Sequence, residues 1–208
     1  MGRYTGPVCR LCRRAGEKLF LKGERCFTQK CAVERRRKPP GDVHFRRPRV
    51  SDWGTQLREK QKARHTYGVL ETQFRKYFQK AQNSPGTTGE TLLQLLERRL
   101  DNVVFRLDFA ESRAQARQLV RHGHIKVGGR KVSIPSFQVK EDDTVEWRET
   151  TQSRDFFKSL SEASPRKTVP GWLALDPAKM SGRVLHLPLV DEMDIILDTR
   201  MIVEFYSK

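Results

Sequence analysis

The sequence predicts an α+β fold, in which a mainly helical body accompanies a small module of one helix and antiparallel strands. In the first half of the chain, apolar residues recur at the three- and four-residue spacing of an amphipathic helix. Residues 124–134 instead alternate apolar and polar side chains around Gly128-Gly129, which is typical of an antiparallel hairpin. A third segment, residues 1–50, holds all four cysteines and shows neither pattern.

Residues 51–84 predict two helices. Ser51 is a suitable N-cap for the first helix, and Gly68 supplies its end. The second helix carries one apolar face, which we interpret as part of a core rather than as a surface for base stacking. The side chains on this face are Phe74, Tyr77, Phe78 and Ala81.

The next segment predicts a single long apolar helix. Residues 87–90 have the Thr-Thr-Gly-Glu pattern of a capping box. Leucines and valines then keep one broad face apolar for about five turns, so the helix is interpreted as structural. Its apolar residues are Leu92, Leu93, Leu96, Leu100, Val103, Val104 and Leu107.

Residues 111–149 predict the small α/β module. Ser112 can cap a helix over residues 113–122, and Gly123 ends it. The hairpin follows, and a last strand is expected over residues 144–148. Three arginines of the helix recur every four residues and therefore share one face, which we expect to be solvent-facing. They are Arg113, Arg117 and Arg121.

Residues 151–208 predict a more neutral scaffold. A helix is expected over residues 154–163, and residues 195–197 and 201–206 are interpreted as strands or docking segments. This part of the chain carries 8 basic and 8 acidic side chains, which favours protein contact over RNA contact.

The charge of the chain is large and unevenly placed. The 208 residues include 41 Lys and Arg against 25 Asp and Glu, for a net charge of +16. Residues 1–50 alone hold 15 basic and 4 acidic side chains. The expected partner is therefore a polyanion, and nucleic acid is the leading one. No apolar run is long enough to span a membrane, and the first thirty residues lack the apolar stretch of a signal peptide.

The four cysteines predict a metal site. Cys9, Cys12, Cys26 and Cys31 follow the spacing C-x2-C-x13-C-x4-C, which suits tetrahedral thiolate coordination. One zinc ion is the expected cofactor, and an iron–sulfur cluster on the same cysteines is the alternative. Free thiols, two disulfides and a redox pair stay open as other interpretations. The neighbouring arginines, Arg10, Arg13, Arg14 and Arg25, are expected to lower the thiol pKa values.

Basic residues in three parts of the chain are expected to contact RNA: the first fifty residues, the first helix of the body and the small module. Residues 34–49 contain arginine runs interrupted by proline and glycine, which we expect to be extended until phosphates order them. The module is expected to bind double-helical RNA by shape. The candidate RNA-binding residues are Arg3, Tyr4, Arg10, Arg13, Arg14, Lys22, Arg35, Arg36, Arg37, Lys38, Arg46, Arg47, Arg49, Lys60, Lys62, Arg64, Arg113, Gln115, Arg117, Arg121, His122, His124, Lys126 and Arg130.

The segment SRAQARQLVRHGHI, residues 112–125, closely resembles the RNA-binding module named after small-subunit ribosomal protein four. That module occurs in several RNA-binding proteins, but further motifs match the bacterial ribosomal family itself, from end to end and in order. They are MGRYTGP at 1–7, LREKQK at 57–62, RLDNVV at 99–104 and IVEFYS at 202–207.

The resemblance implies a structural constituent of the small ribosomal subunit that is not an enzyme. It implies binding to the 5′ domain of 16S ribosomal RNA, a role in starting 30S assembly, and contact with ribosomal protein five that influences translational accuracy. Arg46, Arg47 and Arg49 match the family's basic stretch near the channel through which mRNA enters. The family fold implies that the α/β module is inserted in the helical body. Cytoplasmic localisation follows, with no membrane and no small-molecule substrate.

Four segments are expected along the chain. Residues 1–45 form the four-cysteine basic segment, 46–97 the helical body and 98–150 the RNA-binding module. Residues 151–208 are expected to supply a helix and strands that pack back on the body.

Two other functions share features of this sequence. RNA pseudouridine synthases carry the same module and a catalytic Arg-Leu-Asp motif, and this chain has Arg-Leu-Asp at 99–101 and 106–108. Here the first motif continues into an apolar helix, and no segment is large enough for an enzyme's second domain. A free-standing RNA chaperone or translational repressor is the other alternative, and extraction with intact ribosomes would distinguish it.

Overall fold

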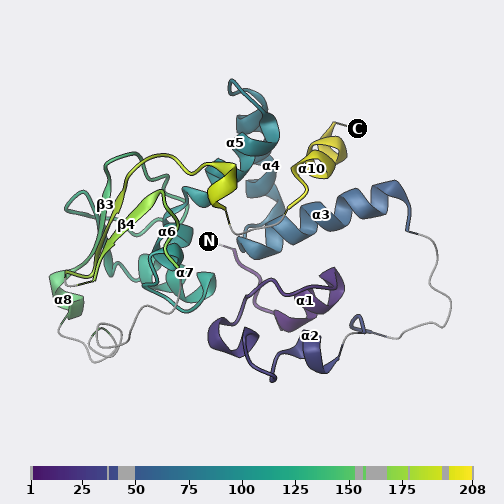
Figure 1. Cartoon of the computed structure of the whole chain (residues 1–208), viewed down its shortest axis with the longest axis horizontal. Helices are drawn as coiled ribbons and strands as arrows, with labels where there is room; N and C mark the ends of the chain where they lie inside the picture. Colours follow the sequence, from purple (N-terminus) through teal and green to yellow (C-terminus); the bar gives the residue numbers. More distant parts are fainter. Residues whose placement is uncertain are drawn as a thin grey trace. The chain divides into compact units, whose positions relative to one another are not determined.

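The computed structural model describes residues 2–36, 38–41, 50–152, 157, 168–177, 179–193 and 197–207. The chain forms two compact units, which are described separately. Unit 1 comprises residues 1–92 and 195–208, and unit 2 comprises residues 93–194 (Figure 1). None of the helices in the described part has the length and hydropathy needed to cross a membrane.

Unit 1 is helical. Its elements are α1 (Cys9–Ala15), η1 (Gly23–Cys26), α2 (Ala32–Arg35), α3 (Asp52–Thr66), α4 (Glu71–Gln82), the first turns of α5 (Thr88–Glu97), and α10 (Thr199–Tyr206). As predicted, Ser51 caps α3, with its Oγ accepting a hydrogen bond from the Gly54 backbone N–H at 3.2 Å. The aromatic face of α4 is buried as expected, with Phe74 and Phe78 at most 4% exposed.

The C-terminal segment 201–206 is an α-helix packed on α3, so the interpretation as a strand is wrong and the interpretation as a docking segment is confirmed. Asp198 caps α10 by accepting a hydrogen bond from the Met201 N–H at 3.2 Å. The helix packs against α3 (Figure 1), and the Tyr206 ring lies 4.6 Å from that of Phe78. Burial against two helices therefore overrides the strand preference of the Ile-Val-Glu-Phe sequence. Residues 195 and 196 lie outside the described part.

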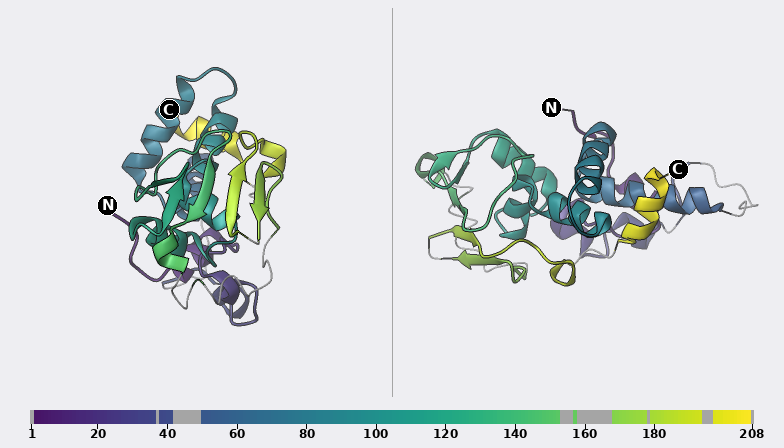
Figure 2. Two further views of the ribbon diagram at one scale, coloured as in Figure 1. Left: turned by 90° about the vertical axis from the view of Figure 1, so that its left-hand side faces the viewer. Right: turned by 90° about the horizontal axis from the view of Figure 1, so that it is seen from above.

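Unit 2 combines several helices with one antiparallel sheet. Its helices are the end of α5, α6 (Leu100–Arg106), α7 (Arg113–Arg121), α8 (Glu149–Gln152) and η2 (Val190–Glu192). The strands are β1 (Ile125–Val127), β2 (Arg130–Lys131), β3 (Thr144–Trp147), β4 (Leu173–Asp176) and β5 (Ser181–Val184). They lie in the order β2-β1-β3-β5-β4 with every neighbouring pair antiparallel. The left view of Figure 2 shows strands of this sheet side by side. The α+β prediction with antiparallel strands is confirmed.

The hairpin turn between β1 and β2 has the expected two residues. Gly128 and Gly129 have φ values of 54° and 75°, the left-handed conformations that a type I′ turn requires. Val127 pairs with Arg130 across the turn. The turn fixes the register, so the alternate residues Ile125 and Val127 face the core and are at most 6% exposed.

The predicted helix over residues 88–107 is broken at Arg99, which separates α5 from α6. Arg99 is extended, with φ −66° and ψ 134°, and forms an isolated bridge with Gln138. The Leu100 N–H donates to the Phe137 carbonyl at 2.9 Å, and the Val139 N–H donates to the Arg98 carbonyl at 3.0 Å. Pairing with residues 137–139 thus replaces the helical hydrogen bonds at this point.

Residues 173–184 extend the sheet of unit 2, because β5 pairs with β3 and β4 pairs with β5. Residues of α6, α7 and the sheet share one core, which includes Trp147 and Trp172 at 2% and 1% exposed. The division of the chain into four segments stays a prediction. The expected helix at 154–163 lies outside the described residues, except for Phe157.

His65 near the end of α3 predicts a pH dependence of stability. Burial, together with the charges of Arg64 and Lys60, lowers its pKa from 6.5 to about 4. Below pH 6.5 the unfolded chain binds a proton that the folded chain does not, so this stability is lost as the pH falls towards 4. Between pH 6.5 and 4, we expect the urea denaturation midpoint to fall less in His65→Gln than in the wild type. Glutamine keeps a hydrogen-bond acceptor for Arg64. Parallel pH profiles would contradict the prediction.

Candidate nucleic-acid interface and cysteine pocket

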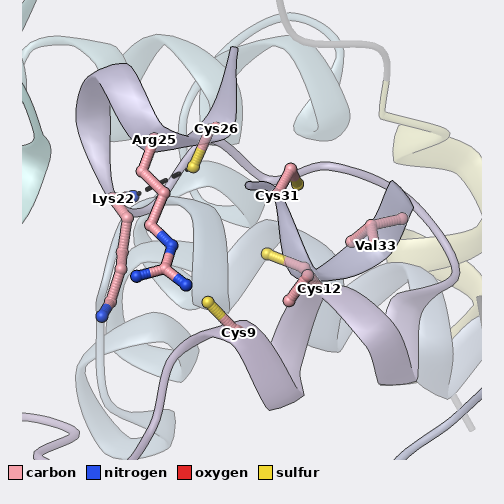
Figure 3. A pocket seen from close by; sticks show the side chains of 8 residues that line it. Cys9, Cys12, Lys22, Arg25, Cys26, Cys31 and Val33 are labelled. Atoms are coloured by element: carbon pink, nitrogen blue, oxygen red, sulfur yellow. Dashed lines mark hydrogen bonds between the residues drawn. The ribbon is translucent and has the colours of Figure 1, made fainter. Parts of the chain in front are cut away.

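The four cysteines line one small pocket, as Figure 3 shows. Cys9 and Cys12 belong to α1, Cys26 ends η1, and Cys31 precedes α2 as its N-cap. The cavity between them measures about 10 Å³, and all four are free thiols. The Lys22 backbone N–H donates to the Cys26 Sγ at 3.3 Å. The tertiary structure therefore brings together the four residues that the spacing selected.

Burial decides the acidity of two of these thiols. It raises the pKa of Cys12 and of Cys26, while one backbone hydrogen bond acts in the opposite direction at each. Repulsion from the neighbouring cysteines raises both values further. The prediction that the thiol pKa values would be lowered is therefore wrong for Cys12 and Cys26, where burial is the largest influence.

No metal site is shown by this arrangement. Among the residues that the structure describes, no group of three or more His, Cys, Asp or Glu side chains is placed to hold a metal ion. The four thiols line one cavity, but their positions do not match those of a metal-ligating group. A metal-bound N-terminal segment is thus not shown, although four cysteine thiolates are a donor set that Zn²⁺ takes.

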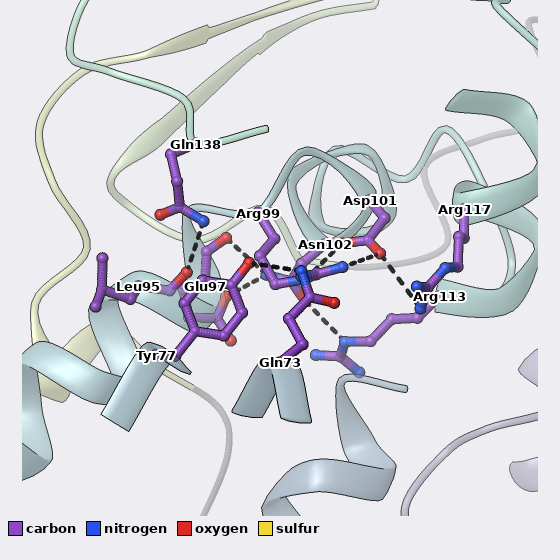
Figure 4. A network of polar contacts seen from close by, with 10 residues as sticks. All are labelled: Gln73, Tyr77, Leu95, Glu97, Arg99, Asp101, Asn102, Arg113, Arg117 and Gln138. Carbon is purple, nitrogen blue, oxygen red and sulfur yellow. Dashed lines mark hydrogen bonds and ion pairs between the residues drawn. The ribbon is translucent and has the colours of Figure 1, made fainter. Parts of the chain in front are cut away.

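Two arginines of α7 point into unit 2 and not into solvent, which corrects the predicted basic stripe (Figure 4). Arg117 is 7% exposed, and its Nη1 lies 3.9 Å from an Asp101 carboxylate oxygen. The Arg113 Nε donates to the Asn102 Oδ1 at 2.7 Å, and its guanidinium lies 4.4 Å from the centre of the Phe105 ring. The expectation that all three arginines face solvent is therefore wrong for Arg117, and Arg113 is half-buried.

These arginines belong to a buried polar network. Asp101 accepts two hydrogen bonds from Arg99, at 3.0 and 2.8 Å. Glu97 accepts from the Asn102 amide at 2.7 Å and from two Arg106 nitrogens at 3.1 Å each. Since burying an unpaired charge is costly, the network ties α7 and the start of α6 to one arrangement.

An exposed basic surface remains on the same module, which we call the α7–hairpin surface. Arg121 and His122 at the end of α7 are exposed, and so are Arg130 and Lys131 of β2. Gly123, with φ 73°, ends the helix and lets the Lys131 stem lie across it, because an added Cβ there would collide with that stem. Cations of two elements thus meet at one edge.

Other predicted module residues have partners within unit 2. Lys126 donates to the Glu149 carboxylate at 2.8 Å, and the His124 ring lies 3.0 Å from the Thr151 hydroxyl. The Gln115 Oε1 accepts from the Glu111 N–H at 2.8 Å.

The three residues of α3 that were predicted to contact phosphates have acidic partners inside unit 1. Lys60 is 4% exposed, donates to Glu71 at 2.8 Å and lies 4.8 Å from the centre of the Phe205 ring. The Lys62 ammonium contacts Glu17 at 2.9 Å, and Arg64 lies 3.7 Å from Glu71. The polar side of α3 is therefore used inside unit 1, and Lys60 does not face solvent.

The candidate residues of the first fifty are mostly exposed. Arg13 is half-buried, with its Nε donating to the Lys38 carbonyl at 2.9 Å. Four candidates lie outside the described residues: Arg37, Arg46, Arg47 and Arg49. The exposed ones are Arg3, Tyr4, Arg10, Arg14, Lys22, Arg35, Arg36 and Lys38.

Sequence reasoning missed Lys131 and a second set of exposed cations on α4. Arg75, Lys76 and Lys80 lie on the side of α4 opposite its buried aromatic face. Their spacing of one, four and five residues could have predicted this surface, because it places them on the polar face, opposite the apolar residues of the same helix.

Comparison with known proteins gives two family matches. The family described as "Ribosomal protein S4/S9 N-terminal domain" matches residues 3–97, and the "S4 domain" matches residues 98–145. The chain is 55% identical over 208 residues to "Small ribosomal subunit protein uS4A" of Symbiobacterium thermophilum. It is 55% and 54% identical to "Small ribosomal subunit protein uS4" of Geotalea daltonii and of Heliobacterium modesticaldum. Each alignment covers 100% of both chains.

Proposed function

Because the chain belongs to the small ribosomal subunit protein uS4 family, we propose that it binds the 5′ domain of 16S ribosomal RNA and helps to start assembly of the 30S subunit. Members of this family are structural components of the small subunit, so the protein is not an enzyme and resides in the cytoplasm within the ribosome. Binding to ribosomal RNA agrees with the S4 domain at residues 98–145.

The observation that carries the RNA proposal is the α7–hairpin surface. It places four exposed basic side chains on a rigid edge formed by a helix end and a two-residue turn. A-form RNA presents phosphates and 2′-hydroxyls across a wide, shallow minor groove that proteins recognise by shape. A compact set of cations on fixed elements is suited to that groove, since the backbone that carries them needs no ordering on binding.

The family resemblance extends the proposal to two further partners. Contact with ribosomal protein five would affect the accuracy of decoding. Arg46, Arg47 and Arg49 match the basic stretch that faces mRNA where it enters the small subunit. Their charge density supports this assignment, because guanidinium groups bind phosphates through paired hydrogen bonds.

We also propose that Cys9, Cys12, Cys26 and Cys31 hold one zinc ion. All four line a single cavity, and the burial and mutual repulsion that raise the pKa of Cys12 and Cys26 would be offset by a dication. When bound, zinc would stabilise the fold of residues 9–35, which contains few large apolar side chains. An iron–sulfur cluster is the alternative occupant.

The α7–hairpin surface predicts the effect of a double substitution. Replacing Arg121 and Lys131 by alanine removes two exposed cations without opening a cavity. The free energy of unfolding should therefore change by no more than about 0.5 kcal/mol. RNA affinity should fall. The slope of log affinity against log salt concentration should become smaller in magnitude by about 1 for each lost phosphate contact. Filter binding to a 5′-domain transcript measures both. Gln118→Ala, an exposed neutral position on α7, is the matched control; equal affinities would show that RNA binds elsewhere.

The cysteine pocket predicts one metal ion per chain. Elemental analysis of protein purified under reducing conditions should find zinc at a ratio of one, and Cys9→Ser/Cys31→Ser should abolish it. Because few apolar contacts hold this segment, metal loss should expose the chain to protease near residues 35–38. The body should still unfold in one cooperative transition. Stoichiometric disulfides, or a protease pattern unchanged by chelation, would contradict the proposal.

A further inference from the structure

Two phenylalanines beside the cysteine pocket form an exposed aromatic pair to which the functions above assign no role. The rings of Phe20 and Phe27 are stacked, with centroids 5.0 Å apart and planes inclined by 27°. Phe20 is 40% exposed and Phe27 is 69% exposed. Single exposed apolar residues are ordinary, but two stacked aromatic rings in solvent form a preorganised surface.

The local fold holds this pair in position. Leu19 and Cys26, each directly preceding one of the phenylalanines, are buried at 5% and 8% exposed. Burial of these two neighbours anchors both ends of the intervening turn. The Phe27 N–H donates to the Glu24 carbonyl at 2.9 Å.

The backbone at Phe20 is strained. Its φ is 50°, in the left-handed region that is unfavourable for a non-glycine residue. An exposed ring contributes little burial to offset this strain. The conformation is therefore maintained by the surrounding turn, and it presents the ring beside Phe27.

Basic residues lie close to the aromatic pair in the sequence. Lys22, Arg25 and Lys30 are exposed within ten residues of Phe20, against two acidic residues, Glu17 and Glu24. Figure 3 shows Lys22 and Arg25 at the rim of the neighbouring cysteine pocket. Aromatic rings with nearby cations are the combination that binds unpaired nucleotides, since the bases stack and the phosphates pair with the cations.

We infer that Phe20 and Phe27 form a stacking platform for an unpaired base of RNA, with Lys22, Arg25 and Lys30 contacting the adjoining phosphates. This inference rests on the proposed RNA-binding function and adds a single-strand subsite in unit 1 to the duplex-type surface of unit 2. An unpaired base in a loop or bulge is required, because bases inside a duplex already stack on one another.

The surroundings favour RNA over a protein partner. Lysine is depleted at the centres of protein–protein interfaces, and two of the three cations near this pair are lysines. Two phenylalanine side chains also form a patch far smaller than the roughly 800 Å² that each partner buries in a typical stable complex.

The test compares the full-length wild type with Phe27→Leu and Phe27→Tyr. Leucine keeps apolar bulk but removes the ring, whereas tyrosine retains stacking. The probes are a short adenylate strand carrying one 2-aminopurine and an RNA duplex of equal length. We expect wild type and Phe27→Tyr to bind the strand and quench 2-aminopurine fluorescence. Phe27→Leu should bind it about fivefold or more weakly, since one stacked base contributes roughly five- to 150-fold. All three should bind the duplex equally.

Two controls separate the possible failures. Leu189→Ala removes a 59% exposed apolar side chain elsewhere and should leave strand binding unchanged. Failure of the wild type to bind a 5′-domain transcript would overturn the proposed function itself. If the transcript binds but Phe27→Leu matches the wild type on the strand, or weakens strand and duplex alike, the stacking platform is wrong. Unchanged RNA binding with loss of association with another ribosomal protein would also overturn it, in favour of protein docking.

Discussion

Binding of the whole chain to a 5′-domain transcript of 16S ribosomal RNA is expected to weaken by about 10³- to 10⁵-fold when monovalent salt rises from about 50 to about 200 mM. This magnitude assumes roughly six to ten phosphate contacts by the estimate for DNA. The net charge of +16 and the exposed cations of both units make that number of contacts attainable. Each neutralised phosphate releases counterions, so affinity falls linearly on a log–log plot.

The salt titration needs a specificity control. A random-sequence RNA duplex of similar length should bind more weakly than the 5′-domain transcript at every salt concentration, because only the transcript presents the matching shape. Equal binding of the two RNAs would contradict the specific part of the proposal. A nearly flat salt profile would contradict the phosphate contacts.

Substitution of Asp101 by asparagine is expected to destabilise unit 2 by about 3–5 kcal/mol. The Asp101 carboxylate is 4% exposed, pairs with Arg99 through two hydrogen bonds and lies 3.9 Å from Arg117. Asparagine preserves the shape but leaves buried guanidinium groups without their counter-charge. Urea denaturation followed by the fluorescence of Trp147 and Trp172, both buried in unit 2, would measure the loss. A Trp53→Phe background removes the signal of unit 1.

The matched control for this substitution is Asp142→Asn. Asp142 also pairs with an arginine at 2.8 Å, Arg183, but the two side chains are 74% and 59% exposed. Exposed pairs contribute roughly 0–1 kcal/mol, so the control should unfold close to wild type. If the two variants differ by less than about 1 kcal/mol, the buried network does not stabilise unit 2 as described.

Local sequence signals predicted many of the elements because the interactions concerned are themselves local. Ser51 and Ser112 were expected as N-caps, and each hydroxyl accepts a hydrogen bond from a backbone N–H three residues later. Gly128 and Gly129 were expected as a hairpin turn and have the required positive φ values. Hydrogen bonds within four residues and backbone steric limits act before any long-range contact forms, so one segment is enough to predict them.

The candidate sites were predicted unevenly. Spacing alone selected four cysteines that do line one pocket, although no metal site is shown there. The prediction that three arginines of α7 face solvent was only partly correct. Their spacing shows that they share one face of the helix, but not which residues cover that face. Phe20 and Phe27, seven residues apart in a segment without periodicity, gave no sequence signal of their stacking.

The sequence by itself determined the family, the α+β class, the caps and turn, and the charge that favours RNA. The tertiary structure alone decided that α5 ends before Arg99, that residues 199–206 form a helix, and that Arg117 and Lys60 are buried. In each of these cases the deciding partner is distant in sequence: Phe137 for the helix break, α3 for α10, Asp101 for Arg117 and Glu71 for Lys60. A buried charge or an unpaired backbone group is stable only where such a partner is supplied, and that depends on how the whole chain folds.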